Sequence, residues 1–260
     1  MKHLAIRSLS IRKENMPYTT PGLGDMTHTV LIGYLYGRQH DTAVTLHLTQ
    51  DKYNRDKPET YQSLLSLLPA NTVSIKVHDV SGLPESQWLQ HIKNQGFEDV
   101  ESYCYMDVRH KYDTPERIDI APYFSVYPKL QPLTVGHDLH LPDRFVTSQW
   151  DSTAKKRRID DQQVRQIQQF YRDQGYHIVT VGGQATDPLL QRSLPHIGYA
   201  MHKAGIHIGV DSGFMHFAQL YLEPQNIHLY ATNAHKWSHH LQRAINNGCR
   251  LNHCWENVKP

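Results

Sequence analysis

The stretch HIGVDSGFMHFAQLYL, residues 207–222, indicates the fold most directly. Its first six residues form a short apolar run that is typical of a strand, and residues 213–222 have the apolar content of a helix. In open α/β sheets, ligands bind outside the carboxyl ends of the strands, where turns of this kind lie. The stretch therefore predicts one strand–turn–helix unit of a parallel sheet, with a candidate ligand site at its turn.

The same alternation of strands and helices extends outward from this stretch through both halves of the chain. In the second half, apolar runs and helical periods predict strands at 144–150, 177–183 and 226–232, a helix at 159–175 and a broken helix at 189–205. In the first half, the same signals predict strands at 3–8, 42–49, 72–80 and 100–108, and helices at 25–37, 58–68 and 86–96. Strands that alternate with helices indicate βαβ units and parallel sheets.

The rhythm breaks at residues 122–143, which contain four prolines and a glycine without a sustained period. We place the domain boundary there. The sequence therefore predicts the α/β class, with two Rossmann-like, doubly wound parallel-sheet domains at 1–130 and 131–260.

Composition excludes several classes of protein. The 260 residues include 27 Lys and Arg, 25 Asp and Glu and 19 His, so the formal net charge is only +2, which excludes a nucleic-acid binder held by charge alone. Three cysteines form an odd count and predict no disulfide framework. The polar start does not resemble a signal peptide, and no window approaches the ~18 apolar residues of a membrane span. We therefore expect a cytoplasmic, reduced protein.

A first glycine-containing turn, GLGDMTHT at 22–29, lies between an expected strand and an expected helix. Gly24 lets the backbone approach a bulky ligand, and the Asp25 carboxylate at the start of the helix would face the same crevice. His28 lies on the first turn of that helix, where it would reach phosphate or sugar oxygens. The alternative is a tight turn in which Asp25 caps the helix and His28 packs in the core.

The second such turn, GVDSGFMH at 209–216, carries a stronger signal for an anion. Ser212 and Gly213 would begin a helix whose backbone N–H groups and dipole favour negative charge. We therefore expect an anionic ligand such as a diphosphate at this turn. The alternative is that Asp211 or Ser212 caps the helix and that His216 packs on its inner face.

Together, the two turns resemble a family. Residues 24–29 resemble the Gly-Asp-x-x-x-Thr segment of the bacterial heptosyltransferases of glycosyltransferase family 9, and residues 209–216 resemble their Gly-x-Asp-Thr/Ser-Gly-x-x-His segment. The resemblance implies the two-Rossmann-domain, GT-B type of fold with an interdomain cleft. It also implies that 1–130 binds the acceptor, that 131–260 binds the nucleotide sugar, and that transfer proceeds with inversion.

The resemblance also implies roles for individual residues. Asp25 corresponds to the catalytic base, which would take the proton of the acceptor hydroxyl. The donor diphosphate would be bound by Asp211, Ser212, Gly213 and His216. A lysine after the first strand of the second half also reaches the diphosphate in the family, and Lys156 in the run KKRR, 155–158, is our candidate; the alternative for this run is a solvated surface loop.

Three further residues are candidates for nucleotide recognition because they lie at the end of the strand expected at 177–183 or just after it: Gly183, Gln184 and, as a ribose partner, Asp187. Histidines and cysteines near the end of the chain, among them His235 and His239, allow a zinc site on paper, but their order matches no standard zinc pattern. We therefore predict no metal and no cofactor apart from the nucleotide-sugar substrate.

These inferences predict an inverting glycosyltransferase that moves a sugar from a nucleotide-diphosphate sugar to an acceptor hydroxyl. The expected acceptor is a bacterial surface glycan similar to lipopolysaccharide core. One alternative is duplex DNA that carries a hydroxymethylated base, as in bacteriophage base-modifying enzymes, because the KKRR run and the many tyrosines and histidines would suit a flipped base. The other alternative is a non-catalytic nucleotide-binding module.

Overall fold

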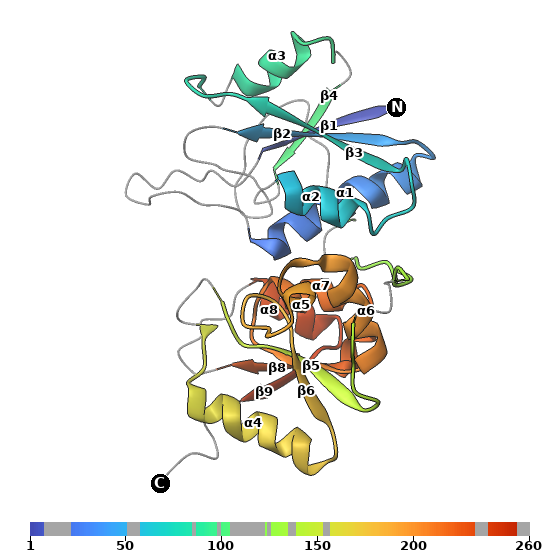
Figure 1. Ribbon diagram of the computed structural model, residues 1–260. Helices are drawn as coiled ribbons and strands as arrows, with labels where there is room; N and C mark the ends of the chain where they lie inside the picture. Colours follow the sequence, from blue (N-terminus) through green and yellow to red (C-terminus); the bar gives the residue numbers. More distant parts are fainter. Residues whose placement is uncertain are drawn as a thin grey trace. The chain divides into compact units, whose positions relative to one another are not determined.

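The computed structural model describes residues 1–7, 22–50, 58–84, 87–97, 100–104, 123, 126–134, 139–152, 157–231 and 239–253. The chain divides into two compact units, unit 1 (Met1–Val126) and unit 2 (Tyr127–Pro260). Each unit contains one β-sheet, and every described strand pair is parallel (Figure 1). This confirms the predicted α/β class with two Rossmann-like parallel sheets.

Unit 1 has a four-stranded sheet in the order β3-β2-β1-β4. Its strands are β1 (Lys2–Arg7), β2 (Val44–Gln50), β3 (Val73–Asp79) and β4 (Val100–Cys104). The chain moves outward from β1 to β3 and then returns to the other side of β1 with β4. The order therefore reverses between β1 and β4, which makes the carboxyl end of β1 the switch point of this sheet.

Three helices cover this sheet: α1 (Leu23–Gln39), α2 (Pro58–Leu65) and α3 (Trp88–Lys93). Figure 1 shows α1 and α2 on one face of the sheet and α3 on the opposite face. Helix α1 is buried along most of its length, and it packs so closely on β2 that a Cβ at Gly33 would lie 2.7 Å from a methyl group of Leu46. Because α1 is buried on all sides, its apolar residues are not confined to one face, and the helix is not strongly amphipathic.

Four histidines on this sheet and on α3 form a hydrogen-bonded chain, which we call the histidine chain. His3 Nδ1 lies 3.1 Å from His47 Nε2, and His47 Nδ1 lies 2.7 Å from His78 Nε2. His78 Nδ1 then meets Gln95 Oε1 at 2.9 Å, and Gln95 Nε2 meets His91 Nε2 at 2.8 Å. The chain thus links β1, β2 and β3 to the end of α3, with the ring of Phe97 against the first three imidazoles.

One assignment of donor and acceptor nitrogens accounts for every hydrogen bond from His3 to Gln95. The amide oxygen of Gln95 only accepts, so His78 donates from Nδ1 and accepts at Nε2 from His47 Nδ1–H, and His47 Nε2 accepts from His3 Nδ1–H. The rings of His47 and His78, each with one donor and one acceptor nitrogen, are then neutral. Burial, the neighbouring His78 and His3 rings and the Lys76 ammonium lower the pKa of His47 to about 3, which agrees with that neutral form.

Unit 2 has a five-stranded sheet in the order β6-β5-β7-β8-β9. Its strands are β5 (Phe145–Gln149), β6 (His177–Thr180), β7 (His207–Gly209), β8 (Ile227–Ala231) and β9 (Arg250–His253). Strand β5 lies between β6 and β7 and is buried at every residue. The order reverses between β5 and β7, so the carboxyl ends of these two strands form the switch point of unit 2.

The helices of unit 2 are α4 (Asp161–Asp173), α5 (Pro188–Arg192), α6 (Leu194–Ala204), α7 (Gly213–Ala218) and α8 (His239–Asn246), with a 3-10 turn, η3 (Pro224–Asn226). Figure 1 shows α4 alone on one face of the sheet and α5 to α8 on the other. The predicted broken helix at 189–205 is confirmed, because Ser193 separates α5 from α6 in an extended conformation.

Two expectations about unit 2 were wrong in detail. Residues 226–232 were expected to be the last strand, but α8 and the edge strand β9 follow. The sequence RLNH of β9 has a single strongly apolar residue, so its pairing with β8 rather than its own pattern defines it as a strand. The helix expected at 213–222 ends at Ala218 and continues as tight turns.

Within the described part of the chain, none of the helices combines the length and the apolar character needed to cross a bilayer.

Candidate active site

The switch point of unit 2 brings two loops side by side. Gln149 at the end of β5 is in register with Gly209 at the end of β7, and Val210 N donates to Gln149 O at 3.2 Å. The segments that follow both strands therefore leave the sheet as neighbours. A pair of loops at the carboxyl ends of adjacent strands, where the strand order reverses, is the usual ligand position in such sheets.

Gly209 is required for this approach. A Cβ at this position would lie 2.4 Å from the backbone oxygen of Gln149, closer than real Cβ contacts allow. The glycine of the predicted motif therefore lets two strands meet closely, rather than supplying a left-handed turn.

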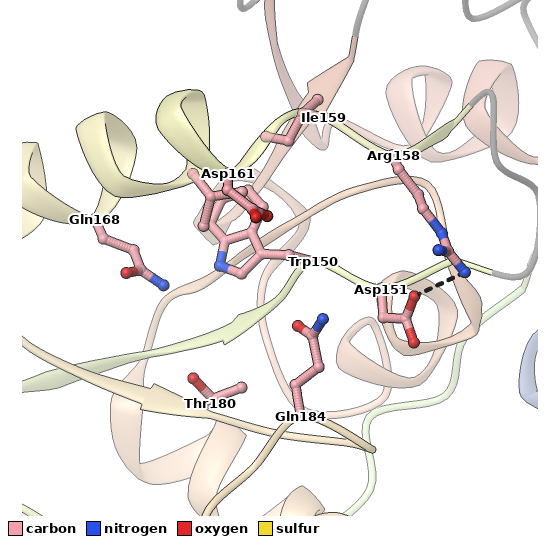
Figure 2. A pocket seen from close by; sticks show the side chains of 9 residues that line it. Trp150, Asp151, Arg158, Ile159, Asp161, Gln168, Thr180 and Gln184 are labelled. Atoms are coloured by element: carbon pink, nitrogen blue, oxygen red, sulfur yellow. Dashed lines mark ion pairs between the residues drawn. The ribbon is translucent and has the colours of Figure 1, made fainter.

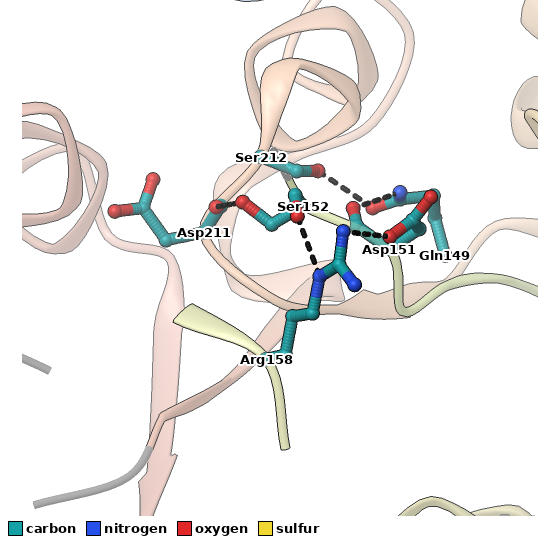
Figure 3. A network of polar contacts seen from close by, with 6 residues as sticks. All are labelled: Gln149, Asp151, Ser152, Arg158, Asp211 and Ser212. Atoms are coloured by element: carbon teal, nitrogen blue, oxygen red, sulfur yellow. Dashed lines mark hydrogen bonds and ion pairs between the residues drawn. The ribbon is translucent and has the colours of Figure 1, made fainter. Parts of the chain in front are cut away.

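The side chain of Gln149 joins the two loops. Its Oε1 accepts a hydrogen bond from Ser212 Oγ at 2.7 Å, and its Nε2 donates to the backbone oxygen of Asp151 (Figure 3). Ser212 is the N-cap residue of α7, yet its side chain makes no cap hydrogen bond. The alternative that Ser212 caps the helix through its hydroxyl is therefore wrong, because this hydroxyl is bonded to Gln149.

Asp211 is a buried carboxylate beside a guanidinium. It is 2% exposed, and its Oδ2 lies 3.5 Å from Arg157 Nε. Its backbone oxygen accepts from Ser152 Oγ at 3.5 Å, and Ser152 O accepts from Arg158 Nε at 2.7 Å (Figure 3). These contacts fix the loop after β7 to the loop after β5, since a buried carboxylate needs a charged or hydrogen-bonding partner.

At least two residues of the basic run at 155–158 contact the loops at the switch point. Arg157 pairs with Asp211, and Arg158 Nη2 pairs with Asp151 Oδ1 at 3.1 Å. Lys156, our candidate for the diphosphate, lies outside the described residues. Sequence reasoning missed Arg157, although the position of the run just after a buried strand was the available signal.

His216 is held from behind by a tyrosine. It is 5% exposed, and its Nδ1 lies 2.7 Å from Tyr127 Oη, with the two rings stacked at 6.2 Å. The Gln219 side chain also hydrogen-bonds Tyr127, and Gln219 Oε1 accepts from Asn247 Nδ2 at 3.2 Å. Burial raises the pKa of Tyr127 far above its usual range, so its hydroxyl keeps its proton.

These contacts assign the tautomer of His216. The hydrogen bond from the Gln219 side chain lowers the pKa of Tyr127, as a donor to the phenol oxygen does, so the amide NH2 group of Gln219 donates to Tyr127 Oη. The tyrosine hydroxyl then donates to His216 Nδ1, which leaves the imidazole proton on Nε2. In this tautomer His216 has a hydrogen-bond donor at Nε2.

The segment at the beginning of unit 2 is bound to the end of α7. Leu130 N donates to Leu220 O at 2.8 Å, and the Lys129 ammonium donates to the backbone oxygens of Gln219, at 3.2 Å, and Leu222. Tyr127 therefore reaches His216 from a strap of extended chain, not from a helix or strand.

In unit 1, Asp25 lies in the first turn of α1, the helix that follows β1. Its Oδ2 accepts from Gly22 N at 2.9 Å, so it closes the start of the helix, as the alternative reading expected. Gly24 and His28 are both buried, and His28 is only 2% exposed. Asp25 is partly buried, and a backbone N–H orients its carboxylate.

Solved structures of glycosyltransferases are similar to this chain in fold. The ADP-heptose lipopolysaccharide heptosyltransferase II of E. coli matches with a TM-score of 0.54 and 13% identity, over 97% of this chain and 90% of its own. A family 9 glycosyl transferase of Veillonella parvula matches with 0.50 and 14%, over 89% and 80%.

The chain has the GT-B fold. This confirms the predicted resemblance to the heptosyltransferases at the level of the fold. The iron-containing dodecameric glycosyltransferase TibC of enterotoxigenic E. coli matches with a TM-score of 0.50 and 13% identity over 91% of this chain, which spans 61% of the length of TibC. No protein-family model and no curated protein matches the sequence.

On this GT-B fold, the three residues predicted for nucleotide recognition lie after β6. Gly183 and Gln184 are exposed on the turn, and Gln184 lines a pocket described below. Asp187 accepts from Leu189 N at 2.8 Å and caps α5, so its carboxylate has a structural role.

Within the described ranges of this GT-B chain, no three histidine, cysteine or acidic side chains are grouped so that they could hold a metal ion. Cys249 and His253, four residues apart, do not share a helix face, because β9 begins at Arg250. Burial raises the pKa of the Cys249 thiol to about 12, so the thiol keeps its proton at neutral pH.

Proposed function

We propose that this protein is an inverting glycosyltransferase that moves a sugar from a nucleotide-diphosphate sugar to the hydroxyl of a glycan similar to lipopolysaccharide core. The observation that carries the proposal is the switch point of unit 2 on a GT-B fold. There Gly209 lets β7 approach Gln149 closely, and Asp211 is buried. The side chain of Gln149 hydrogen-bonds Ser212 at the start of α7.

Unit 2 binds the donor in this proposal. The diphosphate lies against the turn at Asp211, Ser212 and Gly213, where backbone N–H groups stabilise the charge that develops on the leaving nucleotide. His216 donates from Nε2 to a phosphate oxygen, and Lys156 adds a positive charge. The nucleoside part lies toward Gly183, Gln184 and Asp187. Support comes from the tautomer of His216 and from the position of Gln184 beside a pocket.

Unit 1 binds the acceptor, and Asp25 is the catalytic base. A sugar hydroxyl is a poor nucleophile, so a carboxylate that removes its proton during attack on the anomeric carbon lowers the barrier. The hydrogen bond from Gly22 N orients the Asp25 carboxylate, which supports this role. Gly24 and His28 belong to the same turn and shape its surroundings.

The substitution Asp25→Asn tests the base. We expect turnover to fall by about 10²–10⁴-fold, because an amide cannot accept the proton, while the Kd of the nucleotide donor stays unchanged. The amide oxygen can still accept from Gly22 N, so α1 stays capped. The matched control is Asp41→Asn, just past the end of α1, where the left-handed backbone suits asparagine and full activity is expected. Retained turnover in Asp25→Asn would exclude Asp25 as the base.

A thermal-shift screen of nucleotides and nucleotide sugars tests the donor class. A ligand that binds only the folded protein raises Tm, so one diphosphate nucleotide should stabilise selectively. Turnover should persist in a chelator, because the proposed site uses N–H groups and cations rather than a metal. Failure of every nucleotide sugar to act as a donor would leave the non-catalytic module as the better account.

The described residues favour a glycan over DNA as the acceptor. The guanidinium groups of Arg157 and Arg158 are paired with Asp211 and Asp151, so both are already partly neutralised. A protein that binds DNA through phosphate contacts should shift duplex DNA in a gel with steep salt dependence. We expect no such shift.

A further inference from the structure

A pocket of about 270 Å³ opens on the α4 side of unit 2, and nothing in the proposed diphosphate site uses it. It lies between the residues that follow β5, the first half of α4 and the end of β6 (Figure 2). Gln149, Asp211, Ser212 and His216 do not line it. The pocket is therefore a separate feature of unit 2.

The floor of the pocket is the indole of Trp150. This side chain is 6% exposed and packs in the core cluster under α4, with its ring 5.8 Å from the ring of Tyr230. Its Nε1–H is buried, and no acceptor among the described residues hydrogen-bonds it. A buried donor without an acceptor has lost its hydrogen bond to water, so a ligand oxygen at this place would bind favourably.

The walls of the pocket combine hydrogen-bond donors and acceptors. Asp161 contributes a carboxylate, Gln168 and Gln184 contribute amides, and Thr180 contributes a hydroxyl. Figure 2 shows these side chains around the Trp150 ring, with the indole nitrogen on the side of the ring that faces Gln168. A ligand that both donates and accepts at several points would satisfy this set.

The charges of the pocket exclude an anion as its preferred ligand. Arg158 is the one cationic side chain among the lining residues, and its guanidinium is paired with Asp151 at 3.1 Å. Asp161 then leaves a net negative charge. A phosphate would face that charge without a cation to offset it, whereas hydroxyl groups would donate to the Asp161 carboxylate at no such cost.

We propose that this pocket binds a neutral, polyhydroxylated furanose or pyranose ring, with a ring or hydroxyl oxygen accepting from Trp150 Nε1–H. Its volume lies just below the usual range of small-molecule pockets, about 300–1,000 Å³, and so fits one ring rather than an oligosaccharide. The ring has two possible sources, the ribose of a nucleoside or a free sugar. If the source is ribose, the inference rests on the proposed function, which places the nucleoside toward Gln184, a residue that lines the pocket; if the source is a free sugar, it goes beyond that function.

Indole N–H signals in a ¹H–¹⁵N NMR spectrum test the proposal directly. The chain has four tryptophans, so the full-length protein gives four such signals, and the substitution Trp150→Phe identifies the one that belongs to Trp150. The probes are methyl β-D-ribofuranoside, methyl α-D-glucopyranoside, adenosine, uridine and inorganic phosphate. Each is added up to about 50 mM or to its solubility limit, because a ligand with a few polar contacts binds with a millimolar Kd.

We expect at least one ring compound to shift the Trp150 signal downfield and saturably, and phosphate to leave it in place. A response to nucleosides alone identifies ribose as the source, and a response to glycosides identifies a free sugar; both support the pocket. The proposal is overturned if no ring compound moves this signal or if phosphate moves it equally. Because no turnover is measured, failure here is distinct from failure of the proposed transferase activity.

Variants of two exposed lining residues provide a second measurement that does not depend on the core. Gln184→Ala and Asp161→Ala should each weaken binding of the active ring compound at least about fivefold, which corresponds to the loss of one hydrogen bond. The matched control is Gln162→Ala, because Gln162 is exposed on the same helix and does not line the pocket. Equal loss in the control, or no loss in the two lining variants, would contradict the proposed contacts.

Discussion

The buried polar groups of unit 1 run across a sheet face, whereas those of unit 2 gather at the ends of two strands. In unit 1, the histidine chain joins three neighbouring strands to Gln95 and packs against Phe97. In unit 2, Gln149, Ser152, Asp211 and Ser212 join the loops that follow β5 and β7. The central members of both networks, such as His47 and Asp211, are buried, but only the second network lies where parallel sheets bind ligands.

The two networks also differ in what their hydrogen bonds do. In the histidine chain, His47 and His78 use both ring nitrogens within the chain, so these rings act as structural hydrogen-bonding groups. In unit 2, the contacts of Gln149 and Tyr127 orient Ser212 and His216 at the start of α7. Burial of polar residues alone therefore does not indicate function; their position relative to the strand ends does.

The largest effect should come from Gly209→Ala. The added Cβ would lie 2.4 Å from Gln149 O, so the two central strands must separate at the switch point. We expect the free energy of unfolding of unit 2 to fall by about 3 kcal/mol, measured by urea denaturation. The control is Gly183→Ala, whose Cβ meets no atom within 4 Å and should change stability by less than about 0.5 kcal/mol. Comparable stability of the two variants would contradict the close approach.

The second largest effect should come from acid, which should lower the free energy of unfolding through His47 in the histidine chain. Folded His47 stays neutral down to about pH 3, whereas the unfolded side chain gains its proton near pH 6.5. The unfolded state therefore binds the extra proton between these values, and stability falls as the pH decreases from about 6.5 toward 3. In His47→Gln, the pH dependence of the unfolding free energy should lose about 1.4 kcal/mol per pH unit over this window.

Urea unfolding at pH 7 and pH 5, followed through the amide NMR signals of unit 1, measures this difference. The exposed His202 supplies the control, since His202→Gln should keep the wild-type pH dependence. An unchanged pH dependence in His47→Gln would show that His47 does not remain neutral in the folded protein.

A smaller effect is expected from Tyr127→Phe. Without the hydroxyl, His216 Nδ1 loses its donor, and the preference for a proton on Nε2 weakens. The ¹⁵N shifts of the His216 ring should move from a pure Nε2–H pattern toward a mixture, and donor binding should weaken by about fivefold to tenfold. An unchanged ¹⁵N pattern would show that Tyr127 does not set the tautomer. Tyr199→Phe, at a half-buried tyrosine on α6, should leave both measurements unaltered.

The smallest effect should come from Asp151→Asn. The ion pair between Asp151 and Arg158 is about half exposed on both sides, and exposed pairs contribute only about 0–1 kcal/mol. Unfolding in urea should therefore change by less than about 1 kcal/mol, and by less still at high salt. A loss comparable to that of Gly209→Ala would show that this pair, and not the close strand approach, holds the loops together.

Much of the fold was predictable because apolar residues repeat with different periods in strands and in helices. The buried strand β5 and the strongly amphipathic α4 were found with boundaries within two residues. The polar edge strand β9 was not, because pairing with β8 defines it more than its own residues do. The glycine turns at 22–29 and 209–216 were found because motif spacing is visible in a sequence.

The partners of those turns were not predictable. Gln149 and Tyr127 are separated from Ser212 and His216 by 63 and 89 residues along the chain, so only the fold shows that they are in contact. The histidine chain was missed for the same reason, because its members come from three strands and a helix. Asp25 and Lys156 remain predictions as catalytic base and diphosphate ligand.

The strap at Tyr127–Leu130 has a practical consequence for dividing the protein. A unit 2 expressed on its own from residue 131 would lack Tyr127 and the hydrogen bond between its hydroxyl and His216 Nδ1. A fragment that starts a few residues earlier keeps the tyrosine, the Lys129 contacts and the Leu130 backbone bond. Four residues of extended chain therefore separate a fragment suitable for ligand binding from one that only reproduces the sheet.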